Sequence, residues 1–122
     1  MEMEPNMEIS VRTLGQVGLF RVEGTMRDGA HLHLRNALIH CIEEGQAKFV
    51  VDMSRTDSLD SAALGELVAC LKRAREDGGD LKLVVRPDGI VHELLQLMRL
   101  DRIFQIFGDE KEATAAFTIG LN

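Results

Sequence analysis

The order of the predicted segments indicates an α/β fold with a mixed sheet, in which an antiparallel hairpin is followed by parallel strands. At the N-terminus, two segments with strand character flank a short turn, which is typical of a hairpin. After them, helix-like and strand-like segments alternate, as expected of a mostly parallel sheet. The chain has 122 residues, the size of one domain. We therefore expect one sheet and about four helices in a single domain.

The first half of the chain supplies the hairpin, one helix and a central strand. Residues 8–14 alternate with period two and residues 17–22 form the second strand, so a turn at Gly15-Gln16 and a loop at residues 24–29 are expected. A helix then begins near Asp28-Gly29 and ends at Gly45. Its apolar stripe has helical spacing and consists of Leu34, Ala37, Leu38, Cys41 and Ile42. Residues 47–53 are almost continuously apolar, which predicts a strand covered on both faces, and residues 54–60 read as a polar loop.

The second half continues the alternation of helices and strands. A helix begins near Asp60-Ser61 and ends at Gly78-Gly79, and a strand follows at residues 81–85. The third helix, after a turn at residues 87–89, has Val91, Leu94, Leu95 and Met98 on one face, and its other side is unusually apolar as well. A short strand at residues 103–107 precedes a last helix, which opens with acidic residues and has an inner face of Ala113, Ala116 and Phe117.

Composition and charge exclude several classes of function. The formal net charge is −6, so the chain lacks the excess of cations that binding to duplex DNA or to anionic lipid needs. We expect no direct contact with nucleic acid and no insertion into a membrane, because no apolar run approaches about 20 residues. Neither a signal peptide nor a disulfide framework is recognisable, which favours the cytoplasm.

The sequence contains no recognisable catalytic, metal-binding or cofactor-binding motif. The four histidines have no metal-ligand spacing, and no glycine-rich phosphate loop is present, so we expect neither a metal nor a cofactor. Cys41 and Cys70 lie on or beside apolar helix stripes, where free cysteine usually packs as a small hydrophobe. Without a triad or a metal set, catalysis is not expected.

The segment from Ser54 to Gly65 is the candidate site. It follows a central strand and leads into a helix, and function concentrates at this edge of α/β sheets. A phosphate on Ser61 would meet the free N–H groups and the positive dipole end of that helix, although Asp57 and Asp60 would make the corner strongly acidic. The residues alone leave a second interpretation open, in which Asp60 or Ser61 is only the helix N-cap.

At this segment the sequence resembles the STAS-domain family, and within it the single-domain anti-sigma factor antagonists of bacteria. The family signature is an apolar strand ending in Asp-hydrophobic-Ser, then Asp-Ser-small-Gly-Leu-Gly after a short loop. Here residues 49–54 and 59–65 carry it, as FVVDMS and LDSAALG, and residues 97–104 match the family tail. The resemblance implies a mixed sheet with helices packed largely on one face. It predicts a domain at residues 8–119, with tails at residues 1–7, expected to be flexible, and 120–122.

The resemblance also implies a regulatory cycle. Unphosphorylated protein would bind an anti-sigma factor, usually a serine kinase that uses ATP and Mg²⁺, and so free the sigma factor. The kinase would phosphorylate Ser61 and end the complex, and a phosphatase would reset it. The residues expected to bind the partner are Asp57, Ser58, Asp60, Ser61, Ala62, Leu64, Gly65 and Glu66. Whether Ser58 can replace Ser61, and whether a homodimer forms, stays open.

Two alternatives belong to other functional classes. Some small STAS proteins are subunits of lipid-transport complexes and grip an ATPase, and here the apolar side of the third helix at Ile90, Leu94 and Leu97 could be the docking surface. We expect this side to be covered by the last helix instead. The other alternative is a scaffold in a stress-signalling assembly.

Overall fold

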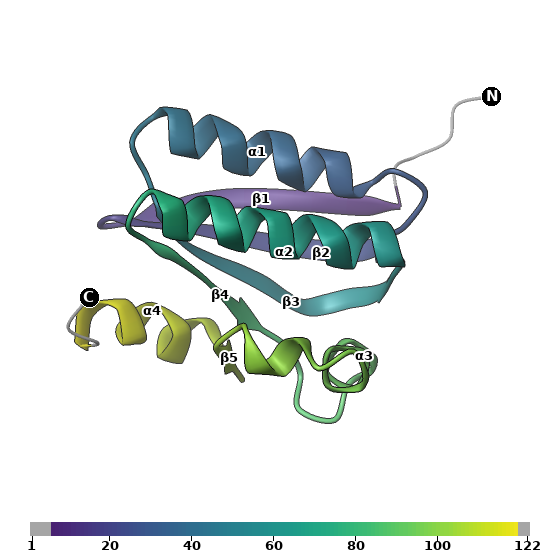
Figure 1. Cartoon of the computed structure of the whole chain (residues 1–122). Coiled ribbons are helices and arrows are strands. Elements are labelled where there is room, and N and C mark those ends of the chain that lie inside the picture. The colour runs from purple at the N-terminus through teal and green to yellow at the C-terminus, as the bar shows by residue number, and fades with distance from the viewer. Residues whose placement is uncertain (1–5, 120–122) are drawn as a thin grey trace.

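A five-stranded mixed sheet is the centre of the structure, a computed structural model that describes residues 6–119 (Figure 1). The first two strands pair antiparallel, and the remaining neighbours pair parallel. The strands lie in chain order across the sheet, as β1 (Met7–Leu14), β2 (Val17–Met26), β3 (Lys48–Leu59), β4 (Asp80–Val84) and β5 (Ile106–Phe107). The mixed sheet with its leading hairpin is therefore confirmed.

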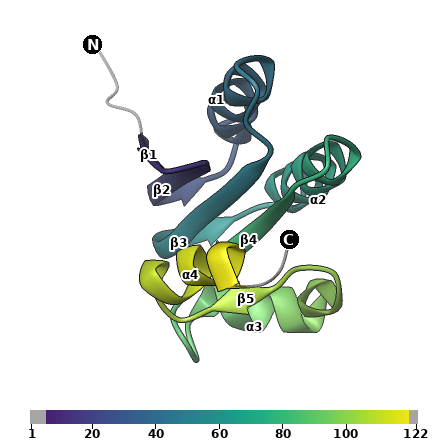
Figure 2. The ribbon, with the colours of Figure 1, turned by 90° about the vertical axis from the view of Figure 1, so that its left-hand side faces the viewer.

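The helices lie on both faces of the sheet, but unequally. Figures 1 and 2 show α1 (His31–Glu43) and α2 (Ser61–Glu76) side by side over one face. The shorter α3 (Ile90–Leu97) adds Val91 and Leu95 to the core on that face. Of the helices within residues 6–119, α4 (Glu110–Ile119) alone packs on the opposite face. A single 3-10 turn at Leu100–Arg102 separates α3 from β5.

The alternation of side chains along the central strands explains this arrangement. Phe20 of β2 and Val51 of β3 face the larger core beneath α1 and α2. Their neighbours Leu19 and Val50 face the smaller core, which Ala113 and Phe117 of α4 close. Because both faces are covered, the first half of β3 is apolar on both sides, as the sequence predicts.

The segment predicted as a polar loop, residues 54–60, is a strand up to Leu59. The second half of β3 pairs with an equally extended β2, with Thr25 opposite Ser58 and Met26 opposite Leu59. The loop prediction was wrong because polar side chains here sit on a regular ladder, with buried Thr56 donating its hydroxyl to the carbonyl oxygen of Val22 at 2.9 Å. Pairing with β4 stops at Asp52, so this half of β3 is hydrogen-bonded to a strand on one side only.

Gly24 makes the extension of β2 possible. Its φ is +100°, and a Cβ there would collide with the carbonyl oxygen of Asn6. That carbonyl accepts a hydrogen bond from the amide of Thr25 at 2.8 Å. Asn6, which precedes β1, is thus hydrogen-bonded to the C-terminal end of β2.

Smaller differences from the predictions lie at the ends of elements. Met7, predicted in the N-terminal tail, is the first residue of β1 and is buried. The strand predicted at residues 103–107 shrinks to Ile106–Phe107 because the 3-10 turn precedes it. The rest of the predicted tails, residues 1–5 and 120–122, lies outside the described residues.

The apolar side of α3 is exposed, contrary to the expectation that the last helix covers it. Ile90 is 62% exposed and Leu97 is 78% exposed, while Leu94 is partly buried against the larger core. The expectation was wrong because α4 crosses to the opposite face of the sheet, where Ala113 and Phe117 find the smaller core.

Candidate functional site

The corner where β3 ends and α2 begins is organised by Asp60. One carboxylate oxygen of Asp60 accepts the amide of Ala63 at 3.0 Å and so caps α2. The other accepts the amide of Asp28, in the loop after β2, also at 3.0 Å. These bonds, first that from Ala63 and then that from Asp28, lower the pKa of the Asp60 carboxyl.

Since Asp60 is the N-cap, Ser61 is not needed for that role. Ser61 is the first residue of α2 and its side chain is exposed, as are Ala62 and Gly65 behind it. A hydroxyl at this position is accessible to another protein and lies beside the unpaired amides at the start of a helix. The two sequence interpretations therefore fall on two adjacent residues, with the cap at Asp60 and a free hydroxyl at Ser61.

Ser58 is held differently from Ser61. Its backbone is part of the β3 ladder opposite Thr25, and its side chain is half-buried. The hydroxyl oxygen accepts a hydrogen bond from Nε of Arg27 at 3.1 Å. Arg27 lies 31 residues away in sequence, and our sequence analysis missed it. The available signal was that neighbouring parallel strands end at the same edge of a sheet, which brings the residue after β2 to the end of β3.

The predicted partner-binding residues do not all reach the surface. Asp57, Ser61, Ala62 and Gly65 are exposed, and Ser58 and Asp60 are half-buried. Leu64 is only 7% exposed and belongs to the larger core. We call the accessible group the β3–α2 corner, and it consists of Arg27, Asp28, Asp57, Ser58, Asp60, Ser61, Ala62 and Gly65.

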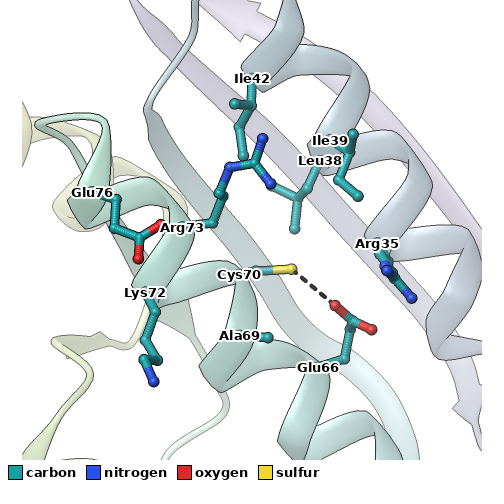
Figure 3. Close-up of a pocket in the computed structure, with 10 residues that line it drawn as sticks. All are labelled: Arg35, Leu38, Ile39, Ile42, Glu66, Ala69, Cys70, Lys72, Arg73 and Glu76. Carbon is teal, nitrogen blue, oxygen red and sulfur yellow. Dashed lines mark hydrogen bonds between the residues drawn. The ribbon is translucent and has the colours of Figure 1, made fainter.

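Glu66 points away from the corner into a groove between α1 and α2 (Figure 3). The groove has a volume of about 500 Å³, and in it the thiol of Cys70 donates to Oε2 of Glu66 at 3.5 Å. Burial, together with the Glu66 carboxylate, raises the pKa of Cys70 to about 12. Burial also raises the pKa of Cys41. Both cysteines stay protonated at neutral pH, so neither is an activated nucleophile.

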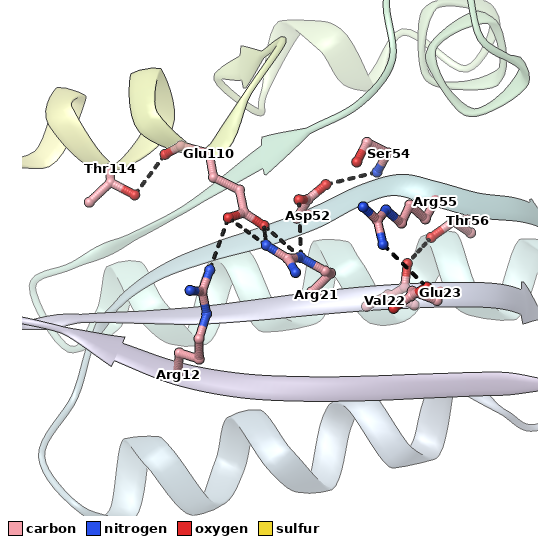
Figure 4. A network of polar contacts seen from close by, with 10 residues as sticks. All are labelled: Arg12, Arg21, Val22, Glu23, Asp52, Ser54, Arg55, Thr56, Glu110 and Thr114. Atoms are coloured by element: carbon pink, nitrogen blue, oxygen red, sulfur yellow. Dashed lines mark hydrogen bonds and ion pairs between the residues drawn. The ribbon is translucent and has the colours of Figure 1, made fainter.

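A second polar cluster, the α4 clasp, joins α4 to the sheet (Figure 4). We define it as Arg12, Arg21, Asp52 and Glu110. The guanidinium of Arg21 donates twice to the Glu110 carboxylate, at 2.9 Å each, and Arg12 donates to it at 3.0 Å. Asp52 lies 3.8 Å from Arg21 and accepts the amide of Ser54 at 2.9 Å.

The pKa values of the two carboxyls of the clasp are shifted in opposite directions. Burial opposes ionisation of Asp52, but hydrogen bonds from Glu110 and Ser54 and the charge of Arg21 lower its pKa overall. The pKa of Glu110 is raised, first by its hydrogen bond with Asp52 and then by burial. In the clasp, both arginines are paired with Glu110 and Arg21 also lies near Asp52, as is typical of a network that stabilises the fold.

Other kinds of site find little support in the described part of the chain. Within residues 6–119, no group of three or more His, Cys, Asp or Glu side chains could hold a metal ion. No helix in that range is long and apolar enough to cross a membrane.

Comparisons with known proteins agree with this fold. The model of the STAS domain family matches residues 8–113. A candidate anti-sigma factor antagonist of Thermotoga maritima is 34% identical over 86 residues, which cover 70% of this chain and 75% of that protein.

Solved structures are similar at lower identity. An anti-sigma factor antagonist of Mycobacterium paratuberculosis superimposes with a TM-score of 0.78 at 22% identity, covering 90% of this chain and 92% of the other. The Bacillus cell fate determinant SpoIIAA, in its phosphorylated form, gives a TM-score of 0.71 at 16% identity, covering 90% and 99% of the two chains. The match of the family model over most of the sequence, with the relative at 34% identity, places this chain in the STAS-domain family.

Proposed function

We propose that this chain is an anti-sigma factor antagonist whose binding to an anti-sigma factor is switched off by phosphorylation of Ser61. The observation that carries the proposal is the free, exposed hydroxyl of Ser61 beside a helix cap that Asp60 already supplies. The similarity to the Thermotoga maritima relative supports the class of partner. The domain acts as a binding module without catalytic activity, in the cytoplasm.

Ser61 is a better phosphoryl acceptor than Ser58. A kinase must bring the acceptor hydroxyl in line with the γ-phosphorus of ATP, which requires an accessible side chain. Ser61 is exposed, whereas Ser58 is half-buried, lies in a strand ladder and accepts a bond from Arg27. In the transfer, the Ser61 oxygen bonds to the γ-phosphorus, the bond to ADP breaks, and the hydroxyl proton is released.

The switch acts through charge at the docking surface. A phosphoserine adds about −1.5 to −2 charges at neutral pH. The corner already holds Asp28, Asp57 and Asp60, so a partner that fits the unmodified surface would have to approach a concentrated negative charge. A loss of about 3 kcal/mol of binding free energy lowers affinity roughly a hundredfold. No movement within the domain is required, and removal of the phosphate by a phosphatase restores binding.

Mass spectrometry after incubation with the cognate anti-sigma factor kinase, ATP and Mg²⁺ tests the proposal. We expect one phosphate on the wild type and on the Ser58→Ala control, and none on Ser61→Ala. Phosphate at another residue of the wild type, or no phosphate at all, would contradict the proposal.

A second candidate function rests on the exposed side of α3. Ile90 and Leu97 are both more than half exposed, which is typical of a surface that another protein covers. In this alternative the domain is a subunit that docks on the ATPase of a lipid-transport complex, without phosphorylation. Co-purification separates the two: an ATP-binding transport subunit that is lost with Leu97→Glu supports the second candidate, and an anti-sigma factor that is lost with Ser61→Asp supports the first.

A further inference from the structure

The backbone around Arg27 is fixed beside the residue that precedes Ser61. Met26, on one side of Arg27, accepts the amide of Asp60 through its carbonyl at 3.2 Å. Asp28, on the other side, donates its amide to the Asp60 carboxylate at 3.0 Å. Arg27 is therefore held between two bonds to Asp60, and its side chain starts next to the first turn of α2.

The guanidinium of Arg27 is engaged only by a weak, neutral acceptor. Its Nε donates to the hydroxyl of Ser58 at 3.1 Å, and the side chain is exposed. Within residues 6–119, no carboxylate lies within ion-pair distance of Arg27, whereas Arg55 nearby pairs with Glu23 at 3.7 Å. The amides of Ala63 and Asp28 are the main causes of the lowered pKa of Asp60, and the positive charge of Arg27 adds to them.

We infer that Arg27 is the internal counterion of phosphorylated Ser61, an inference that rests on the function proposed above. A phosphate offers a guanidinium two parallel charge-assisted hydrogen bonds, which are about twice as strong as a bond to a neutral hydroxyl. When Ser61 carries a phosphate, Arg27 leaves Ser58 and turns to the phosphate. The long arginine side chain makes this change without movement of the backbone.

The consequence is that one modification changes the docking surface twice. The partner of the unmodified protein meets a free cation at Arg27 and a neutral hydroxyl at Ser61. After modification, the anion is present and the cation is withdrawn toward it. A partner that places a carboxylate against Arg27 thus loses an attraction and gains a repulsion.

Titration of the phosphate by ³¹P nuclear magnetic resonance tests this inference. Phosphoserine is placed at residue 61 during translation with an expanded genetic code, so the test does not depend on any kinase. An adjacent cation favours the dianion and lowers the second pKa of the phosphate from its ordinary value of about 6. We expect Arg27→Gln to raise that pKa by about 0.5 or more, allowing for screening by solvent.

The matched control is Arg55→Gln, which removes a second exposed arginine, one that lies in β3, and we expect it to change the phosphate pKa by less than about 0.2. The ¹⁵N resonance of Nε in Arg27 should move on phosphorylation in the otherwise wild-type protein. An unchanged phosphate pKa in Arg27→Gln, with a native amide spectrum, or an unmoved Arg27 resonance, would overturn the inference. Neither result bears on whether a kinase modifies Ser61, which the mass spectrometry decides.

Discussion

The α4 clasp and the β3–α2 corner contain similar residues but differ in how their charges are paired. Both draw on β3 and both contain an arginine and an aspartate. In the clasp, Arg21 donates two bonds of 2.9 Å to the Glu110 carboxylate, and the side chain of Asp52 is 7% exposed. In the corner, Arg27 is exposed and donates to a serine. Charges that are paired with one another hold α4 to the sheet, whereas exposed charges beside a free hydroxyl remain open to modification and to a partner.

The largest expected effect tests the corner. Phosphoserine at residue 61 should lower the affinity for the anti-sigma factor roughly a hundredfold, because the partner would face a dianion whose charge a single arginine only partly offsets. Isothermal titration calorimetry measures the change. Ser61→Asp, with less charge, should lower affinity by about tenfold, and Ser61→Ala should bind as the wild type does. Unchanged binding of Ser61→Asp to every natural partner would remove the basis of the proposed switch.

The next largest effect tests the clasp. Glu110→Ala leaves the donors of Arg12 and Arg21 without their acceptor, so the free energy of unfolding should fall by roughly 1–2 kcal/mol. Urea denaturation measures it. Glu112→Ala is the matched control, since Glu112 is an exposed acid in the same first turn of α4. Equal losses in the two variants would mean that the helix dipole, and not the clasp, is responsible.

A smaller effect is expected from removal of the cap. Asp60→Ala frees the amides of Ala63 and Asp28, which loosens both the start of α2 and the loop that carries Arg27. Thermal unfolding should show a lower Tm, with a smaller decrease than that caused by Glu110→Ala. Asp57→Ala, which alters an exposed acid of the same corner, should leave the Tm unchanged.

The smallest effect is a dependence of stability on pH. Because folding lowers the pKa of Asp60, its stabilising contribution is complete above the unfolded-state pKa of about 3.9 and is lost as the pH falls through the lower folded-state value. Asp60→Asn keeps a capping side chain without a titratable group. The difference in stability between wild type and Asp60→Asn should therefore shrink below about pH 4. A difference that is constant with pH would contradict this role of the carboxylate.

Local patterns predicted most of the fold, and long-range pairing accounts for what they missed. Periodicity located the helices because each has one apolar stripe, and continuous apolar residues located the first half of β3. The second half of β3 is polar, and its strand conformation depends on a ladder with β2 that only the tertiary structure supplies. The prediction that α4 covers α3 was wrong for a similar reason. The face of the sheet on which α4 packs depends on the contacts of Phe117 with the smaller core, which are long-range.

The candidate site was predictable in part. The position of Ser61 at a helix start followed from the sequence, because the cap and the helix are local. Arg27 was not predictable from local pattern, since the residues between it and Ser58 include α1 and most of β3. Leu64 was expected to bind the partner, but its side chain packs in the larger core instead.

The one-sided pairing of the second half of β3 sets the corner apart from the rest of the sheet. Beyond Asp52, β2 and β3 continue as a two-stranded extension that does not pair with β4, and the corner lies at the end of this extension. Segments 24–28 and 53–61 together form a unit at the end of β2 and β3. If both segments are exchanged between relatives, the choice of partner should pass from one domain to the other. If only one segment is exchanged, Arg27 and the serines at positions 58 and 61 would come from different proteins.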